Sequence, residues 1–280
     1  MSGFHPTRGE RIDIGGRCLR AVMAGPDAGP LVVLESGAFG CAADWAEVQK
    51  QLADEGIRSL AYDRAGLGFS DPGPRPRDSQ AIAHDLGLLL DRMSLEGPLI
   101  LVGHSMAGLM VRLHARGLGD RVLGLVLVDA TTPESWDVPT VRRVVGGFGS
   151  IVSLVGRTAP LGYMRPLAWM IGDNIGLDGE AGLEKRRIYG SASHTRWAAE
   201  EVQQWGASAL QGQAIGRPDP DLPVAVVTAG ARPGLKSLQT APALASRRGH
   251  INHVAAANHA SLLGRDHAHH IVEAVRRMVP

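Results

Sequence analysis

The chain has 280 residues, of which 44% are hydrophobic and 20% are charged, a composition typical of a globular protein with a full hydrophobic core. Its formal net charge of +1 provides no global attraction to nucleic acid or to anionic membranes, and nucleic acid is not expected as a partner. The two cysteines, Cys18 and Cys41, lie in different contexts and predict neither a disulfide framework nor a metal site.

Two further segments bear on where the protein works. Residues 1–17 contain no apolar run before Ile12, so we expect no secretory signal and a cytoplasmic protein. The apolar segment 144–164 is interrupted by Arg157, Pro160 and several glycines, and we therefore expect no transmembrane helix there.

The first half of the chain alternates strand and helix signals, which favours a mostly parallel sheet covered on both faces. The predicted strands are Arg11–Ile14, Cys18–Met23, Leu31–Leu34, Ile57–Tyr62, Leu99–Val102 and Val122–Val128. Helices are predicted for Trp45–Glu55, which Asp44 would cap, for the amphipathic segment Ser79–Met93, and after Ser105.

After Asp129 the pattern changes, because residues 133–220 contain no convincing buried strand. This stretch has helical and glycine-broken segments, including Ala198–Leu210, and it is too long for an ordinary loop. Strand signals return at Val224–Val227 and weakly at Ile251–Ala256, before a final helix at His267–Met278. We interpret residues 1–132 and 221–280 as one core and residues 133–220 as a helical lid inserted into it.

The stretch Val102-Gly103-His104-Ser105-Met106-Ala107-Gly108 is the most informative of the chain. An apolar strand leads into it and a helix-forming segment follows, as in a nucleophile elbow, which holds one hydroxyl above the end of a sheet. The usual pattern is G-x-S-x-G, whereas here Ala107 takes the second glycine position and the glycine is delayed to Gly108. His104 is expected to pack below the elbow rather than to act as a base.

A serine nucleophile needs a histidine base, and that base needs a carboxylate that orients it. Of the six histidines after residue 249, His259 is the best placed, because its loop follows the last predicted strand and lies at the same sheet edge as Ser105. The alternative is a structural histidine.

The choice of acid follows from exclusion and placement. The loop after Val224–Val227, residues 228–234, holds no carboxylate, whereas Asp129 ends the strand next to the elbow strand. A carboxylate in this position must find partners or water, because burying it unpaired is costly. We expect Asp129 to be the acid, the alternatives being that it caps the following turn or that Glu35 takes its place.

An oxyanion hole requires two amides directed at the developing negative charge. Met106, which follows the nucleophile, is one expected donor. Ala38, in the loop Glu35-Ser36-Gly37-Ala38-Phe39-Gly40, is the other.

These residues together resemble the α/β-hydrolase superfamily, in its lidded serine hydrolase and esterase-like branch. The resemblance rests on the elbow, on the segment Tyr62–Ser70, on Leu127-Val128-Asp129-Ala130 and on the His259 loop. It implies a mostly parallel eight-stranded sheet with helices on both faces, and structural roles for Asp63 and Arg64. Members commonly carry His-Gly in the oxyanion loop, where this chain has Ser36-Gly37.

The sequence therefore predicts a serine hydrolase without cofactor or metal that acts on an ester, lactone or similar acyl bond of a small molecule with an apolar part. Dehalogenase and epoxide hydrolase chemistry in this superfamily would need an aspartate where Ser105 stands. Acyl transfer, C–C bond hydrolysis and lyase chemistry remain open on the same frame, because fold alone does not choose among them. A ligand-binding protein that has lost efficient turnover is a further alternative.

Overall fold

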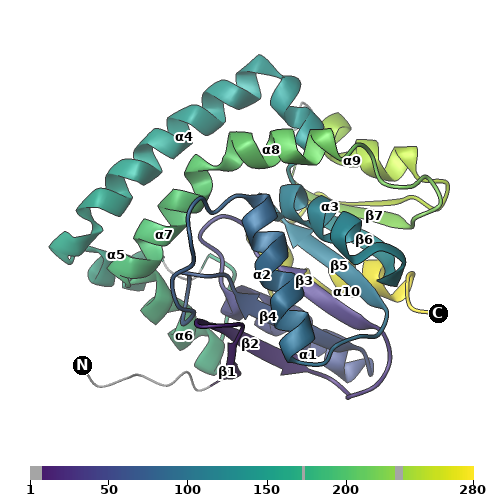
Figure 1. The fold of residues 1–280 in the computed structure, drawn as a ribbon, viewed down its shortest axis with the longest axis horizontal. Coiled ribbons are helices and arrows are strands. Elements are labelled where there is room, and N and C mark those ends of the chain that lie inside the picture. Colours follow the sequence, from purple (N-terminus) through teal and green to yellow (C-terminus); the bar gives the residue numbers. More distant parts are fainter. Residues whose placement is uncertain (1–7, 172–173, 231–235) are drawn as a thin grey trace.

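The computed structural model of the chain describes residues 8–171, 174–230 and 236–280. Part of the loop after Val227, residues 231–235, lies outside the described residues. An eight-stranded sheet runs through the molecule in the order β1-β2-β4-β3-β5-β6-β7-β8; the two pairs that β2 forms are antiparallel and the other pairs are parallel (Figure 1). The strands are β1 (Glu10–Asp13), β2 (Cys18–Ala24), β3 (Leu31–Glu35), β4 (Arg58–Asp63), β5 (Leu99–His104), β6 (Val122–Val128), β7 (Val224–Ala229) and β8 (His250–Val254). The mostly parallel eight-stranded fold that the sequence predicts is confirmed.

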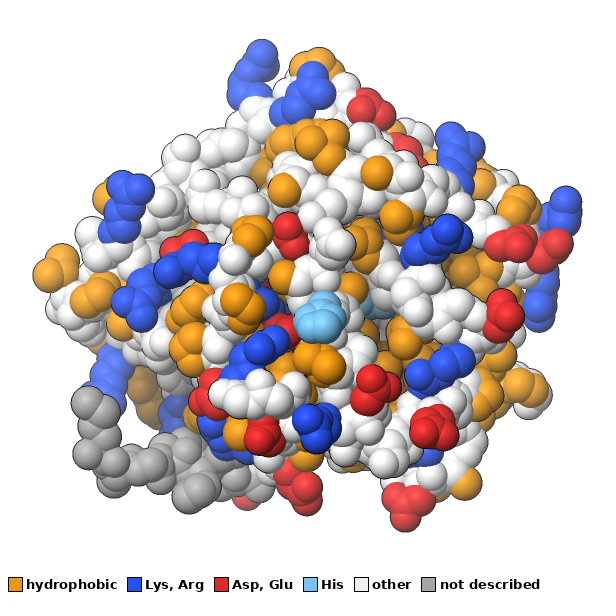
Figure 2. Space-filling view, in the orientation of Figure 1, with side chains coloured by type: hydrophobic (Ala, Val, Ile, Leu, Met, Phe, Trp, Pro, Cys, Tyr) orange, Lys and Arg blue, Asp and Glu red, His pale blue; other side chains and the backbone are white. Residues whose placement is uncertain are grey.

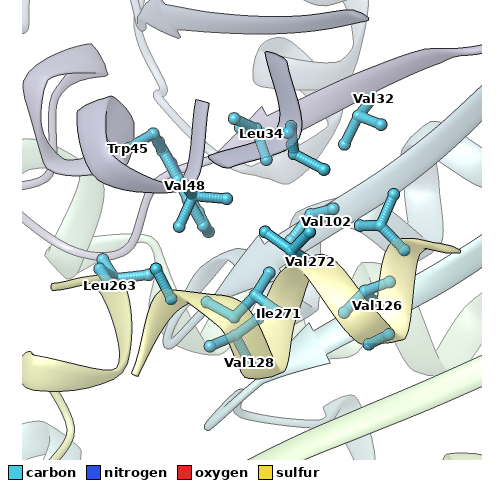
Figure 3. Close-up of a cluster of buried hydrophobic side chains, with 14 of the residues drawn as sticks. Val32, Leu34, Trp45, Val48, Val102, Val126, Val128, Leu263, Ile271 and Val272 are labelled. Atoms are coloured by element: carbon cyan, nitrogen blue, oxygen red, sulfur yellow. The ribbon is translucent and has the colours of Figure 1, made fainter. Parts of the chain in front are cut away.

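The central strands are apolar along their whole length because both faces of the sheet are covered. Successive residues of β3 point to opposite sides: Val32 and Leu34 join one buried cluster, whereas Leu31 and Val33 join the other. The first cluster packs against α1 (Ala46–Asp54) and α10 (Ala268–Arg276), with Trp45, Val48, Ile271 and Val272 meeting the strand valines (Figure 3). The second packs against α2 (Ser79–Arg92), α3 (Ala107–Leu118) and α9 (Lys236–Ala245).

Between β6 and β7 the described residues form helices and no strand. They are η3 (Pro133–Asp137), α4 (Pro139–Thr158), η4 (Ala159–Leu161), α5 (Met164–Ile171), α6 (Gly179–Tyr189), α7 (Ala192–Gln203) and α8 (Trp205–Ala214), and we call them the helical insertion. Figure 1 shows α4 alongside α7, with α8 continuing from the end of α7 along one edge of the sheet domain. The insertion contacts the loops that follow β3 and β4, which places it at the carboxyl edge of the parallel strands.

Three local details differ from the sequence analysis. The glycines of residues 144–158 do not interrupt the helix, because α4 is continuous for 20 residues and ends only at Thr158, before Pro160; within the described chain, Pro139–Leu161 is long and apolar enough, by length and composition only, to cross a membrane. The expected helix Ala198–Leu210 is two helices that meet at Gln204. Asp44 does not cap α1: it lies in the short helix η1 (Ala42–Trp45), where its carboxylate accepts from Cys41 N and pairs with Lys185.

Candidate active site

Ser105 lies at the turn between β5 and α3 with a backbone φ of +56°, a conformation that is unfavourable for any residue with a side chain. The turn is held by two backbone hydrogen bonds to the neighbouring strand end: Ser105 N donates to Val128 O at 3.0 Å, and Thr131 N donates to Ser105 O at 2.9 Å. The sequence therefore forms the strained strand-to-helix turn that a nucleophile elbow requires.

The delayed glycine of the elbow has a steric explanation. A Cβ on Gly108 would lie 2.4 Å from Thr131 O, and one on Gly103 would lie 2.8 Å from the Val111 side chain, so neither position tolerates a side chain. Ala107 has a buried side chain that this packing accommodates. After the nucleophile, the position that must be glycine is therefore 108, because it contacts the segment after β6.

Asp129 and His259 are brought together: His259 Nδ1 lies 2.6 Å from Asp129 Oδ2. The other carboxylate oxygen of Asp129 accepts from Gln239 Nε2 at 3.1 Å and from Ala229 N at 3.3 Å. Asp129 also has a positive φ, of +41°, so its backbone departs from the extended conformation of the strand β6 that precedes it.

The protonation of this pair follows from its partners. Burial acts to raise the pKa of Asp129, but the hydrogen bond and charge of His259, with the Ala229 and Gln239 donors, outweigh it and lower the pKa below its usual value. The ionised carboxylate accepts the proton on Nδ1 of His259, which leaves Nε2 with its lone pair. Among the described contacts, no hydrogen bond joins Ser105 Oγ to His259, and such bonds often tighten only when substrate is bound.

His104 packs below the elbow as expected. Its Nε2 lies 2.9 Å from the His259 carbonyl oxygen, which can only accept, so the proton of His104 is on Nε2. Burial and the neighbouring His259 lower the pKa of His104 to about 3. His104 is therefore neutral near pH 7, and its ring supports His259, with the two ring centroids 4.5 Å apart.

The oxyanion loop approaches the nucleophile closely, since a Cβ on Gly37 would lie only 2.8 Å from Ser105 Cβ. Ala38 follows Gly37 directly, and Met106 precedes α3. Neither amide donates a hydrogen bond to another residue in the described part of the chain, so both are available to a ligand. The structure thus leaves the two expected donors beside Ser105 unpaired.

Glu35 does not approach His259. It is fully buried and accepts hydrogen bonds from Arg64 Nη1 at 2.8 Å, from His114 Nε2 at 2.9 Å and from the Tyr62 hydroxyl. Burial acts to raise the pKa of Glu35, but the His114 hydrogen bond and the Arg64 charge outweigh it and lower the pKa. The alternative in which Glu35 serves as the triad acid is therefore wrong.

Arg64 links this buried carboxylate to the oxyanion loop and to the helical insertion. Its guanidinium donates to Ser36 O at 2.5 Å and to Gly37 O at 2.9 Å, and pairs with Glu201 of α7 at 2.7 Å. All three charged side chains are about 1% exposed, so each charge depends on the others for compensation. The structural role expected for Arg64 includes holding the peptide groups next to Ala38.

His194, also on α7, holds the same loop at its other end. Its Nε2 lies 3.1 Å from Phe39 O, and its Nδ1 accepts from Gly68 N at 3.1 Å. Burial lowers the pKa of His194 to about 4, so the ring is neutral and uses one nitrogen as donor and one as acceptor. Sequence reasoning missed Glu201, His194 and Gln239, because each lies in an ordinary helical pattern and its partner is more than a hundred residues away.

A cavity of about 360 Å³ lies beside the site. Neighbours of Ser105 and Asp129 line it, among them Thr131, whose amide bonds Ser105 O, and Gln239, which bonds Asp129. The rest of the lining is largely apolar and comes mainly from α4, α8 and α9: Val141, Val144, Val145, Trp205 and Leu238.

Comparison with known proteins agrees with this geometry. The family model described as the alpha/beta hydrolase fold matches residues 30–158. The structure of a thermophilic esterase from Thermogutta terrifontis superimposes with a TM-score of 0.66 at 21% identity, covering 98% of this chain and 100% of that one. With the sheet order and the elbow, these findings show that the chain has the α/β-hydrolase fold and is similar in sequence to members of that family.

Two curated relatives are similar over shorter stretches. The non-heme chloroperoxidase of Streptomyces lividans is 36% identical over 110 residues, which is 39% of this chain and 40% of that protein. Epoxide hydrolase A of Mycobacterium tuberculosis is 31% identical over 147 residues, which is 49% of this chain and 43% of that protein. The chain spans from a fifth to about half of the length of the curated relatives it matches.

Proposed function

We propose that the chain is a serine hydrolase that cleaves an ester, lactone or similar acyl bond. The observation that carries the proposal is the 2.6 Å contact between Asp129 Oδ2 and His259 Nδ1, beside a serine held at φ +56° on an elbow. A serine at this position distinguishes the chain from epoxide hydrolases of the superfamily, which require an aspartate there.

In the proposed reaction, Ser105 Oγ attacks the substrate carbonyl carbon while His259 Nε2 takes the hydroxyl proton. The carbonyl oxygen becomes an oxyanion that the Ala38 and Met106 amides stabilise. Collapse of this intermediate breaks the acyl bond, and the imidazolium gives its proton to the leaving alcohol oxygen. Water then attacks the acyl-enzyme by the same route and releases the acid. Asp129 keeps the imidazole in the productive tautomer throughout.

The cavity supports a substrate with an apolar part, because Val141, Val145 and Leu238 line it. A larger side chain in this cavity should change the preference for acyl-chain length more than the rate on a short ester. Val141→Phe should lower kcat/KM for an octanoyl ester by about tenfold while leaving that for the acetyl ester nearly unchanged. Equal losses for both esters would place the acyl chain elsewhere.

The direct test is a series of chromogenic esters and lactones, assayed with wild-type protein and with Ser105→Ala. We expect turnover by the wild type and a loss of about 10⁴-fold or more in the variant. Binding of the esters without turnover would favour the alternative of a ligand-binding protein. Turnover in the variant at a tenth of the wild-type rate would exclude Ser105 as the nucleophile.

A further inference from the structure

Helix α4 packs through two glycines and one valine and leaves several of its large apolar side chains exposed. Gly149, Val152 and Gly156 form its buried side, and a Cβ on Gly156 would lie 2.9 Å from Ala199 Cβ of α7. The glycines allow the two helices to approach closely, and Val152, the one large apolar side chain of α4 that is fully buried, packs with Ala199 and Val202 of α7. Several other large apolar side chains of α4 are exposed, a reversal of the usual pattern of a surface helix.

The exposed side chains are concentrated. Seven large apolar side chains in the described chain are more than 60% exposed, and six of them lie between residues 144 and 170. Isolated exposed apolar residues are ordinary, whereas such clustering marks an interaction site. We call the six the apolar rim: Val144, Ile151, Leu154, Leu161, Trp169 and Met170, which are 63–81% exposed.

The charged side chains within the segment that carries the apolar rim have one sign. Arg142, Arg143, Arg157 and Arg165 are exposed in this segment, and the sequence has no Asp or Glu between Asp137 and Asp173. None of these four arginines forms an ion pair with another described residue. Figure 2 shows Lys or Arg side chains beside hydrophobic ones at the left edge, where Figure 1 places the lower end of α4 and α5.

The exposed apolar side chains and the exposed arginines together favour one kind of partner. A second copy of the chain docked through the same surface would bring the arginines of both copies together, which is unfavourable. A membrane-spanning role for α4 would require its glycine side to leave α7. An anionic bilayer surface satisfies both features, because acyl chains accept the apolar side chains, lipid headgroups accept the arginines, and tryptophan prefers the boundary between them.

We propose that the apolar rim docks onto the surface of an anionic lipid bilayer, with α4 lying on the bilayer rather than crossing it. Val144 also lines the cavity beside Ser105, so the docked face adjoins that cavity. Binding itself does not depend on catalysis. It can therefore be measured with Ser105→Ala protein as well as with the wild type, which separates this proposal from the proposed hydrolase activity.

The test is co-sedimentation with vesicles of phosphatidylcholine alone and with vesicles in which about a third of the lipid is phosphatidylglycerol. We expect binding to the anionic vesicles that weakens with added salt. Ile151→Ser/Leu154→Ser should lower the partition coefficient by about tenfold or more. Arg142→Gln/Arg157→Gln should lower it by about fivefold for each charge removed. Leu244→Ser, at the one equally exposed apolar site that the described residues have outside the rim, should bind as wild type does.

Activity on a soluble acetyl ester should stay unchanged in Ile151→Ser/Leu154→Ser, which also shows that this variant is folded. The proposal is overturned if wild-type protein binds neither kind of vesicle, or if the rim variants and the Leu244→Ser control bind equally. It is also overturned if light scattering reveals a dimer that Ile151→Ser/Leu154→Ser dissociates, because the rim would then be a contact between copies.

Discussion

Ser105 and Asp129 share a backbone feature that separates them from most residues of the chain, since both have a positive φ although neither is glycine. They end adjacent strands, and Ser105 N donates to the carbonyl of Val128, the residue before Asp129. Strain of this kind costs of order 1–3 kcal/mol per residue and persists only where the surroundings impose it. Here the surroundings are the two strand ends and the segment after β6.

Replacing Asp129 by Asn tests how His259 is oriented. The amide is similar in shape, so the contacts with Gln239 and Ala229 leave the fold intact, but it no longer fixes the tautomer or stabilises the imidazolium. We expect kcat to fall by about 10³–10⁴-fold with little change in KM. Ester kinetics with circular dichroism as the folding control would measure this, and a loss below about tenfold would mean that another group orients His259.

At the scale of elements, α7 holds the oxyanion loop at two places. Glu201 acts through Arg64 on the carbonyls of Ser36 and Gly37, and His194 bonds Phe39 O. The amide of Ala38 lies between these two anchors. The helical insertion therefore positions the predicted oxyanion donor.

Arg64→Lys would keep the charge but lose the planar fork that reaches two carbonyls and two carboxylates. Arg64 is a positioning residue, so we expect kcat to fall by about 10²-fold while KM changes little. Arg75→Lys is the matched control, because Arg75 also pairs with α7, through Glu200, but in an exposed ion pair. Parallel changes in kcat and KM, or equal effects of the two substitutions, would contradict the positioning role.

Helix α4 offers a test of its packing against α7. Gly156→Ala would place a methyl group 2.9 Å from Ala199 Cβ and should destabilise the protein by about 1–3 kcal/mol. Gly147→Ala, where nothing lies within 4 Å, should instead stabilise it by about 0.5–1 kcal/mol through helix propensity. Denaturant unfolding measures both, and a stabilising Gly156→Ala would show that α4 does not pack on α7.

For the whole molecule, acid stability should reflect two buried neutral histidines. The pKa values of His104 and His194, about 3 and about 4, lie below the 6.5 of an unfolded chain. Between pH 6.5 and 4 the unfolded chain takes up protons that the folded chain does not, so stability is present at higher pH and is lost as the pH falls. The loss should be roughly 1.4 kcal/mol per pH unit for each histidine.

His194→Gln should reduce this pH dependence, because glutamine can donate to Phe39 O and accept from Gly68 N without titrating. Urea unfolding at pH 7 and pH 5 compares the two proteins. We expect the variant to lose less stability over this interval, by about 2 kcal/mol. An unchanged difference would show that His194 does not titrate with folding.

The sheet was predictable because its strands are short apolar runs bounded by turns, as in Leu31–Leu34 and Val122–Val128. Asp129 and His259 were chosen from placement at one sheet edge, and the structure brings their side chains together. The division between α7 and α8 was missed because the two helices meet at a glutamine, Gln204, and not at a proline or glycine that would mark a helix end. The Arg64–Glu201 pair was missed because 137 residues separate its members and no local pattern connects them.

The net charge also did not indicate how charged residues are distributed along the chain. A formal charge of +1 averages over the molecule, whereas the segment between Asp137 and Asp173 holds arginines without an acidic residue. The glycines of this segment were interpreted as interruptions, but α4 continues through them, and Gly149 and Gly156 lie on the side that packs against α7. Composition alone could reveal neither feature.

The central claim is that Ser105 is an activated nucleophile, and covalent labelling by a serine-directed phosphonate tests it most directly. Intact-mass measurement should show one added phosphonyl group on wild-type protein, and peptide mapping should locate it on Ser105. Asp129→Asn should react far more slowly, and Ser105→Ala should not react at all. Labelling at another serine, or equal labelling of wild type and Ser105→Ala, would contradict the account.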